Sequence, residues 1–128
     1  MLGSDKKSTA LVLIRVVLAA LMFVHGSARI SYGIVDDFGG FLGSHGIPLG
    51  FFVAWGITLF EIIGSVLLAV GSYTWLIALL FAVELAVGVA LVHWKEGWFV
   101  VGAGRNGMEY SALLITSFLA VAYANYKK

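Results

Sequence analysis

Four apolar stretches, each about as long as a membrane-spanning helix, occupy most of this 128-residue chain. The hydrocarbon core of a bilayer is about 30 Å thick, so a helix that crosses it needs about 20 mainly apolar residues. The charged fraction is only 12%, against about 25% in soluble domains, and 61% of the residues are hydrophobic. We therefore predict an all-α integral membrane protein, a four-transmembrane-helix bundle that forms a single membrane domain over residues 1–128. The predicted spans are residues 9–28, 49–70, 73–94 and 107–123.

The distribution of basic residues predicts the orientation of these spans. Four spans place both termini on the same side of the membrane. Four lysines lie near the termini, whereas Arg29, Lys95 and Arg105 lie in the connections on the opposite side. Because cytoplasmic segments are enriched in Lys and Arg, we expect both termini in the cytoplasm.

The connections between the spans also carry local signals. The first connection is rich in glycine and holds a short apolar segment, Phe38–Leu42. This segment is too short to cross a membrane, so we expect it to lie at the interface or to dip back among the helices. The second and third spans meet at Gly71 and Ser72, which predicts a tight turn between two helices.

Ionisable residues inside the apolar spans are the most informative positions. Arg15, Glu61 and Glu84 fall in the middle third of their predicted spans. A charge at the centre of a bilayer costs about 2.5–3.5 kcal/mol, so such groups should face the interior of the bundle and pair there. We predict an Arg15–Glu61 pair deep inside. Two interpretations stay open, namely a structural pair that fixes helix register and a functional site.

Helical spacing predicts which helix faces turn inward. Three spans place small and polar residues on one stripe, as interfaces between helices in lipid do. The stripes are Arg15, Ala19, Met22, Gly26 and Arg29 in the first span, Ala54, Thr58, Glu61 and Ser65 in the second, and Glu109, Ala112, Thr116 and Ala120 in the fourth.

The third span is less regular. Glu84 and His93 are nine residues apart, so they project about 180° from each other at about 100° per residue. They can face one site only if the helix distorts. We expect the face of His93, Ala86 and Ala90 to be the packed one. Glu84 then faces a partner helix, another subunit or a lipid headgroup.

A second polar group is predicted near the membrane face opposite the termini. It consists of His25, His93, Glu109 and Tyr110, which lie near the ends of their spans. Such side chains can bind a ligand or transfer protons, and they can equally be ordinary interfacial residues. Both interpretations stay open.

Several kinds of site are disfavoured by the residues present. The absence of cysteine excludes disulfides, thiolate metal sites and Fe–S clusters. Haem between His25 and His93 is disfavoured because both lie at helix ends, and a metal bound by these two with Glu109 lacks a fixed ligand spacing. Residues 102–107 match G-x-G-x-x-G, but only an apolar span follows, so no nucleotide site is predicted. A net charge of +1 gives no basis for nucleic-acid binding.

The order of these polar positions carries a family resemblance over almost the whole chain. The positions are Arg15, His25-Gly26, Gly46-Ile47-Pro48, Glu61, Gly64, Gly71, His93, Gly97 and Gly107-Met108-Glu109-Tyr110. In this order and placement the chain resembles the DoxX family of small prokaryotic membrane proteins. That family usually has a lysine shortly after the His-Gly, and Arg29 takes its place here.

The resemblance implies a four-helix protein of the prokaryotic plasma (inner) membrane. The family is related to the DoxD subunit of thiosulfate–quinone oxidoreductase, and some members are associated with membrane redox and oxidative-stress complexes. The polar positions that it carries over are Arg15, His25, Glu61, His93, Glu109 and Tyr110, without an assigned chemistry.

The leading hypothesis is a membrane subunit of a redox or oxidative-stress system that binds a quinone-type ligand near His25, His93 and Glu109. Histidine and tyrosine would donate hydrogen bonds to the quinone carbonyls, and Glu109 and Glu61 would carry protons. The expected partners are the lipid bilayer and either other redox proteins or a second copy of the chain. The alternatives are a non-catalytic scaffold or assembly factor, and a small-solute or proton pathway in an oligomer.

Overall fold

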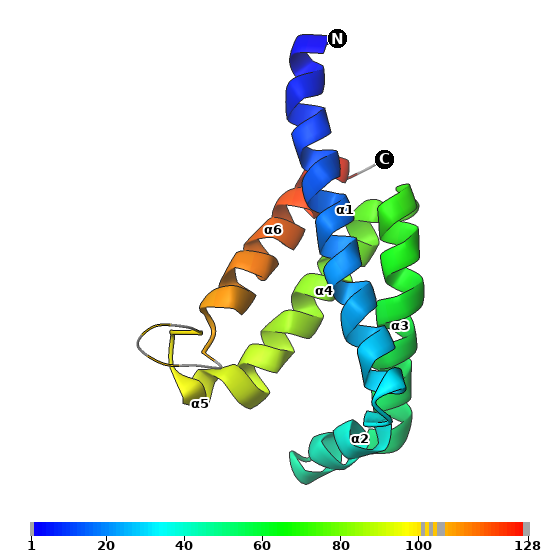
Figure 1. Cartoon of the computed structure of the whole chain (residues 1–128), viewed down its shortest axis with the longest axis vertical. Helices are drawn as coiled ribbons and strands as arrows, with labels where there is room; N and C mark the ends of the chain where they lie inside the picture. Colours follow the sequence, from blue (N-terminus) through cyan, green and yellow to red (C-terminus); the bar gives the residue numbers. More distant parts are fainter. Residues whose placement is uncertain (1, 101, 103, 105–106, 127–128) are drawn as a thin grey trace. The chain divides into compact units, whose positions relative to one another are not determined.

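The computed structural model describes residues 2–100, 102, 104 and 107–126. Contacts between Cα atoms divide the chain into two compact units. We call residues 16–72 the α1–α3 unit, and residues 1–15 together with 73–128 the α4–α6 unit. The prediction of an all-α protein is confirmed. The helices, labelled in Figure 1, are α1 (Leu2–Ser31), α2 (Val35–Ser44), α3 (Gly50–Val70), α4 (Thr74–Gly88), the π-helix η1 (Val89–His93), α5 (Trp94–Glu96) and α6 (Glu109–Asn125).

Three helical stretches in the described part of the chain are long and apolar enough to cross a membrane. They are Asp5–Ser31, Gly50–Val70 and Thr74–Glu96, which correspond to the first three predicted spans. Helix α6 has 17 residues, or about 25 Å at about 1.5 Å per residue, and is shorter than the hydrocarbon core. The fourth span and the common side of both termini therefore stay predictions. Among the basic residues used to predict orientation, Arg105, Lys127 and Lys128 lie outside the described residues.

The turn after α3 has the geometry that its sequence predicts. Gly71 adopts a left-handed conformation with a φ of 86°. Its N–H donates to the carbonyl of Leu68, and the N–H of Ser72 donates to the carbonyl of Leu67. These two bonds satisfy carbonyls at the end of α3, and glycine adopts the required conformation at no steric cost. The helix therefore stops at Val70.

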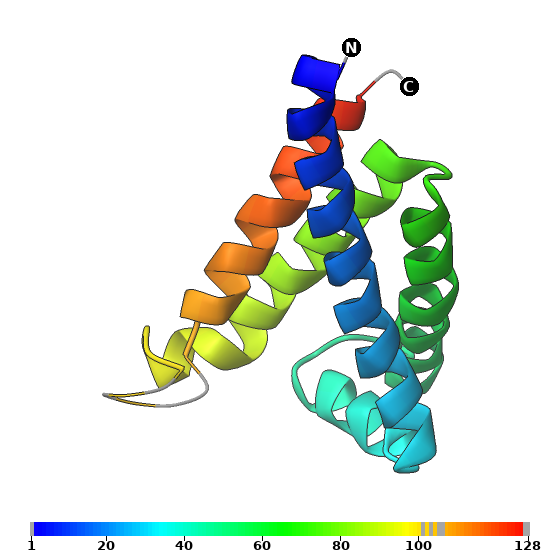
Figure 2. The ribbon, with the colours of Figure 1, turned by 45° about the horizontal axis from the view of Figure 1, so that its top comes forward.

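Within the α1–α3 unit, α2 packs against the first turn of α3 (Figures 1 and 2). A Cβ atom at Gly39 would lie 2.9 Å from the Cα of Phe51, and one at Gly50 would collide with the carbonyl oxygen of Gly39. Both positions therefore require glycine, as helix contacts in membrane proteins often do. The segment Phe38–Leu42, expected at the interface or among the helices, belongs to a helix that covers the start of α3.

Helix α1 contacts the middle of α3. A Cβ atom at Gly26 would lie 3.0 Å from the main-chain oxygen of Thr58 and 3.1 Å from the Cβ of Glu61. In the predicted stripe of α1, Ala19 and Met22 are buried. The predicted stripe of α3 is confirmed in full, because all four of its members are buried: Ala54, Thr58, Glu61 and Ser65.

The α4–α6 unit is built on a pair of helices with aromatic contacts. The rings of Phe81 and Phe118 lie 5.3 Å apart, and both residues are fully buried. The rings of Trp75 and Tyr126 lie 5.1 Å apart. Because the α4 position advances from 75 to 81 while its partner moves back from 126 to 118, the two helices are antiparallel, as Figure 2 shows.

The predicted inward stripe of α6 is wrong. Thr116 and Ala120 are exposed, and Glu109 and Ala112 are only half-buried. A different face of α6, with Phe118 at its centre, packs against α4 instead, and ring packing contributes to this contact. The buried face consists of Ser111, Leu114, Phe118, Val121 and Ala122.

The predicted packed face of the third span is wrong at its two alanines. Ala86 and Ala90 are exposed and His93 is half-buried, whereas all three residues of the other face, Glu84, Gly88 and Leu91, are half-buried. The face of Glu84 continues the row of buried residues in the first half of α4. Burial of this mostly apolar row sets which side of the helix packs, because it removes more apolar surface from solvent than burial of two alanines would. The role of Glu84 as a partner-facing residue stays a prediction.

A π-helix changes the relation between Glu84 and His93. In η1 the hydrogen bonds run from i to i+5, so a turn takes in one residue more than a turn of α-helix. The π-helix therefore acts as a one-residue insertion. It reduces the rotation about the helix axis between Glu84 and His93 by about 100° compared with an uninterrupted α-helix. The separation of about 180° expected for Glu84 and His93 therefore falls to about 80°. The π-helix is thus the kind of helix distortion that Glu84 and His93 need in order to approach a common face.

Candidate functional site

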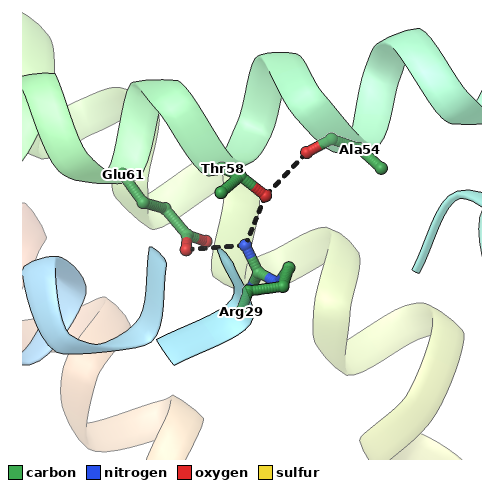
Figure 3. A network of polar contacts seen from close by, with 4 residues as sticks. All are labelled: Arg29, Ala54, Thr58 and Glu61. Carbon is green, nitrogen blue, oxygen red and sulfur yellow. Dashed lines mark hydrogen bonds and ion pairs between the residues drawn. The ribbon is translucent and has the colours of Figure 1, made fainter. Parts of the chain in front are cut away.

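A charged hydrogen-bond network joins the end of α1 to the middle of α3 (Figure 3). The Nη1 of Arg29 donates to the Oε1 of Glu61 at 3.0 Å and to the Oγ1 of Thr58 at 2.9 Å. The side chain of Glu61 is 2% exposed and that of Arg29 is 15% exposed. Hydrogen bonds between ionised partners are stronger than neutral ones, especially where little solvent reaches them. We call Arg29, Thr58 and Glu61 the α1–α3 polar network.

Each helix of the α1–α3 unit contributes to the position of Arg29. The hydroxyl of Thr58 donates to the carbonyl of Ala54 at 2.8 Å, which turns its oxygen toward Arg29 as an acceptor. Gly26, one turn before Arg29, lets α1 approach α3 closely. The ring of Phe38 from α2 lies 4.6 Å from the guanidinium carbon, a cation–π contact.

The prediction named the wrong partner for Glu61. It chose the correct face of the first helix but the wrong position along that helix. The sequence prediction paired Glu61 with Arg15, whereas the structure pairs it with Arg29, about 21 Å further along α1 at about 1.5 Å per residue. The prediction ended the first span at Ala28 and set its end level with the start of the second. Because α2 covers the start of α3, the end of α1 lies beside the middle of α3 instead.

The sequence did contain signals for the residues that this prediction missed. Arg29 already lay on the same helical stripe as Arg15, and Thr58 lay on the stripe of Glu61. In addition, Gly39 and Gly43 are four residues apart, a spacing of small residues that is typical of close helix contacts. That spacing would have indicated that the segment of Phe38 packs on a helix.

Glu109, another predicted site residue with a carboxylate, closes the loop before α6. Its side chain accepts a hydrogen bond from the N–H of Val100 at 2.8 Å, and its own N–H donates to the carbonyl of Trp98 at 2.9 Å. The N–H of Gly107 donates to the carbonyl of Phe99 at 3.0 Å. A Cβ at Gly107 would collide with this backbone, 2.5 Å from the Phe99 oxygen. The role that the structure gives Glu109 is therefore local.

The other predicted site residues lie in both units. His25 is exposed on α1 in the α1–α3 unit, whereas His93 is half-buried at the end of η1 and Tyr110 is exposed on α6. A cluster of these residues with Glu109 would join the two units and stays a prediction. In the described part of the chain, no three His, Asp or Glu side chains are grouped so that they could hold a metal ion.

Comparison with known proteins adds family information to this geometry. Residues 10–94 match the family model DoxX. A protein of Bacillus subtilis (strain 168) named "Putative oxidoreductase CatD" is 30% identical to the chain over 116 residues. The matched region covers 89% of this chain and 79% of that relative. No solved structure matches the chain.

Proposed function

The chain belongs to the DoxX family, and from this premise we propose that it is a membrane subunit of a redox or oxidative-stress system that binds a quinone-type ligand. The name of its relative in Bacillus subtilis supports the redox part of this proposal. The proposed location is the plasma (inner) membrane of a prokaryotic cell. The proposed partners are other redox proteins or a second copy of the chain.

The observation that carries the ligand part of the proposal is the α1–α3 polar network. Glu61 is almost fully buried in a helix that is otherwise apolar enough to cross a membrane. A buried pair of ions is often no more stabilising than well-packed apolar residues of similar volume. Ionisable groups at such positions are therefore more typical of ligand or proton sites than of stability alone.

The chain's composition limits which part of a redox reaction it can supply. Reduction of a quinone to a quinol takes up two electrons and two protons. The chain has no cysteine, so the thiol and Fe–S routes by which many proteins move electrons are absent. We assign to this chain the binding of the quinone and the supply of protons, and to a partner protein the supply of electrons.

The second predicted polar group, near the membrane face opposite the termini, is also part of this proposal. His25, His93 and Tyr110 are the proposed donors to a quinone carbonyl or carriers of protons. Glu109 is the weakest member of this group, because its carboxylate is engaged by the N–H of Val100. The Arg29–Glu61 pair is the site whose geometry favours a ligand most directly.

The proposal is tested with the wild-type chain purified in lipid nanodiscs. We expect saturable quenching of its tryptophan fluorescence by decylubiquinone, because quinones quench indole fluorescence when they are bound nearby. Empty discs with added free tryptophan serve as the control for quinone dissolved in the lipid. A second measurement is extraction of quinone from protein purified out of native membranes. Linear quenching equal to the control, with no quinone in the extract, would contradict the proposal.

A scaffold function is the second candidate, and one surface favours it. Trp94, Trp98 and Phe99 are exposed where α5 and the following loop leave the spanning helix. A scaffold that recruits soluble enzymes through this loop would lose its partners in a Trp98→Ala/Phe99→Ala variant. Retention of all co-purifying proteins by this variant would count against a scaffold. The apolar segment Phe38–Leu42 of the first connection would be a second candidate for this role, but it belongs to α2, which packs on α3, and is less suited to it.

A further inference from the structure

The α1–α3 polar network uses only one edge of the Arg29 guanidinium. This group carries five N–H donors in one plane. Nη1 donates to Thr58 and Glu61, so its two N–H bonds are occupied. The Nε and Nη2 atoms, with three N–H bonds, have no acceptor among residues 2–100, 102, 104 and 107–126. The outer edge of the guanidinium is thus a set of donors that the described protein does not satisfy.

The remaining donors of Arg29 lie at the edge of the contact between α1 and α3, where the side chain is 15% exposed. The centroid of the Phe38 ring lies 4.6 Å from the guanidinium carbon, and Ile62 and Gly26 lie in the contact between α1 and α3. Both helices are candidate membrane spans. Where this edge faces lipid rather than water, an N–H group without a hydrogen bond carries a desolvation cost that the lipid cannot reduce. An oxygen acceptor is therefore expected in the plane of the guanidinium, at its outer edge.

We infer that this edge binds a carbonyl oxygen of an apolar ring molecule that enters from the lipid. The inference rests on the proposed function, in which that molecule is of the quinone type. Nε–H and Nη2–H form a fork in which one oxygen can accept two hydrogen bonds. The N–H bonds lie in the plane of the guanidinium, so the acceptor approaches in that plane. Arg29 becomes a ligand-binding residue, and Glu61 and Thr58 hold it in position.

The charge of the pair selects a neutral oxygen over an anion. Arg29 and Glu61 together are neutral, and Glu61 is almost fully buried. A phosphate or carboxylate at the outer edge would leave a net negative charge in this poorly hydrated place, whereas a ketone oxygen would leave it neutral. Thr58 cannot act as a further donor, because its hydroxyl already donates to the carbonyl of Ala54. The ligand oxygen is therefore held by Arg29.

The inference is tested by binding of decylubiquinone to the chain in lipid nanodiscs. Arg29→Lys keeps a positive charge beside Glu61 but replaces the planar fork with a single ammonium. We expect the variant to bind decylubiquinone at least tenfold more weakly than the wild type. Tyr32→Phe is the matched control, because Tyr32 follows the same helix end but is exposed. Its affinity should stay within twofold of the wild type.

A second measurement keeps the test valid if the lysine variant does not fold. In the wild type, the ¹H–¹⁵N resonance of the Arg29 Nε–H should shift on addition of decylubiquinone. It should not shift with a short-chain phosphatidic acid, which offers a phosphate oxygen instead. A shift with the lipid alone would overturn the assignment of a neutral carbonyl.

The possible outcomes separate this inference from the proposed function. If the wild type binds decylubiquinone while Arg29→Lys binds equally well and the Arg29 resonance does not move, the ligand lies elsewhere. The inference is then wrong, and the proposed function survives. If the wild type does not bind decylubiquinone at all, both are wrong.

Discussion

The two units of the chain use their carboxylates in opposite ways. In the α1–α3 unit, Glu61 takes its partner from a different helix, 32 positions away in the sequence. In the α4–α6 unit, Glu109 takes its partner from the adjoining loop, nine positions away. The first carboxylate joins two helices, whereas the second closes a loop. The comparison shows that the sequence separation between a glutamate and its partner distinguishes a contact between helices from a local loop contact.

The contacts between helices differ in the same way. Helices α1, α2 and α3 meet at glycines, where a Cβ atom would collide with a neighbouring backbone. Helices α4 and α6 meet at aromatic rings, with Phe81 against Phe118 at the centre. Close backbone approach leaves space for only a few polar side chains in a fixed geometry. Ring packing fills the centre of the α4–α6 contact with apolar atoms, and the buried polar residues of these two helices, Thr74 and Ser111, carry no charge.

The largest expected effect is that of Glu61→Gln. This substitution leaves the Arg29 guanidinium without its counter-charge, and breaking a buried ion pair from one side costs about 3–5 kcal/mol. Because Arg29 is partly exposed, we expect a loss near the lower end, about 3 kcal/mol, in the unfolding free energy measured by steric trapping in bicelles. The exposed Glu96→Gln is the control and should change little. A loss below about 1 kcal/mol for Glu61→Gln would show that the pair is not a joint between helices.

A smaller effect is expected from Gly50→Ala, which adds one methyl group where α2 meets α3. The new Cβ would collide with the carbonyl oxygen of Gly39, so α2 must move. Overpacking of this kind costs about 1–3 kcal/mol, measured as above. Gly56→Ala is a matched control in the same helix, because a Cβ there meets nothing within 4 Å. The control should be neutral or slightly more stable, since alanine favours helix over glycine. Equal effects at the two glycines would contradict the close contact.

The smallest effect is expected from Glu109→Gln. The amide oxygen of glutamine can still accept the hydrogen bond from Val100, and no cation among the described residues is paired with Glu109. We expect a loss of about 1 kcal/mol or less in the unfolding free energy, together with unchanged protection of the Val100 amide in hydrogen exchange. Glu109→Ala, which removes the acceptor, should speed that exchange. If glutamine at 109 cost as much as glutamine at 61, the contrast between the two units would fail.

Much of the fold could be predicted from local sequence. The first three apolar stretches became helices long enough to span a membrane because length and apolar content alone decide this property. Gly71 ended α3 as its conformational freedom predicts. The inward stripe of α3 was also predictable, since small and polar residues repeat on one face over four positions. Each of these features depends on residues close together in the chain.

The wrong predictions concern features that depend on how one helix is positioned against another. The face of Arg29 was predictable from its spacing, but its depth was not, because depth depends on α2 covering the start of α3. The stripe of α6 failed because Phe118 found a ring to pack against, and a partner of this kind cannot be read from one helix. Phe38 was missed for the same reason: its role arises only when α2 meets the end of α1.

The π-helix at Val89–His93 has a consequence for how this chain can change in evolution. Loss of one residue from this stretch would turn the π-helix into ordinary α-helix and leave the residues after it on almost the same faces, because the π-helix already offsets one residue, or about 100°. A deletion inside a spanning helix, normally among the most damaging of changes, would be absorbed here without breaking the helix. Homologous proteins can therefore differ in length at this place. An ungapped alignment through η1 would then match His93 with a residue on the wrong side of the helix.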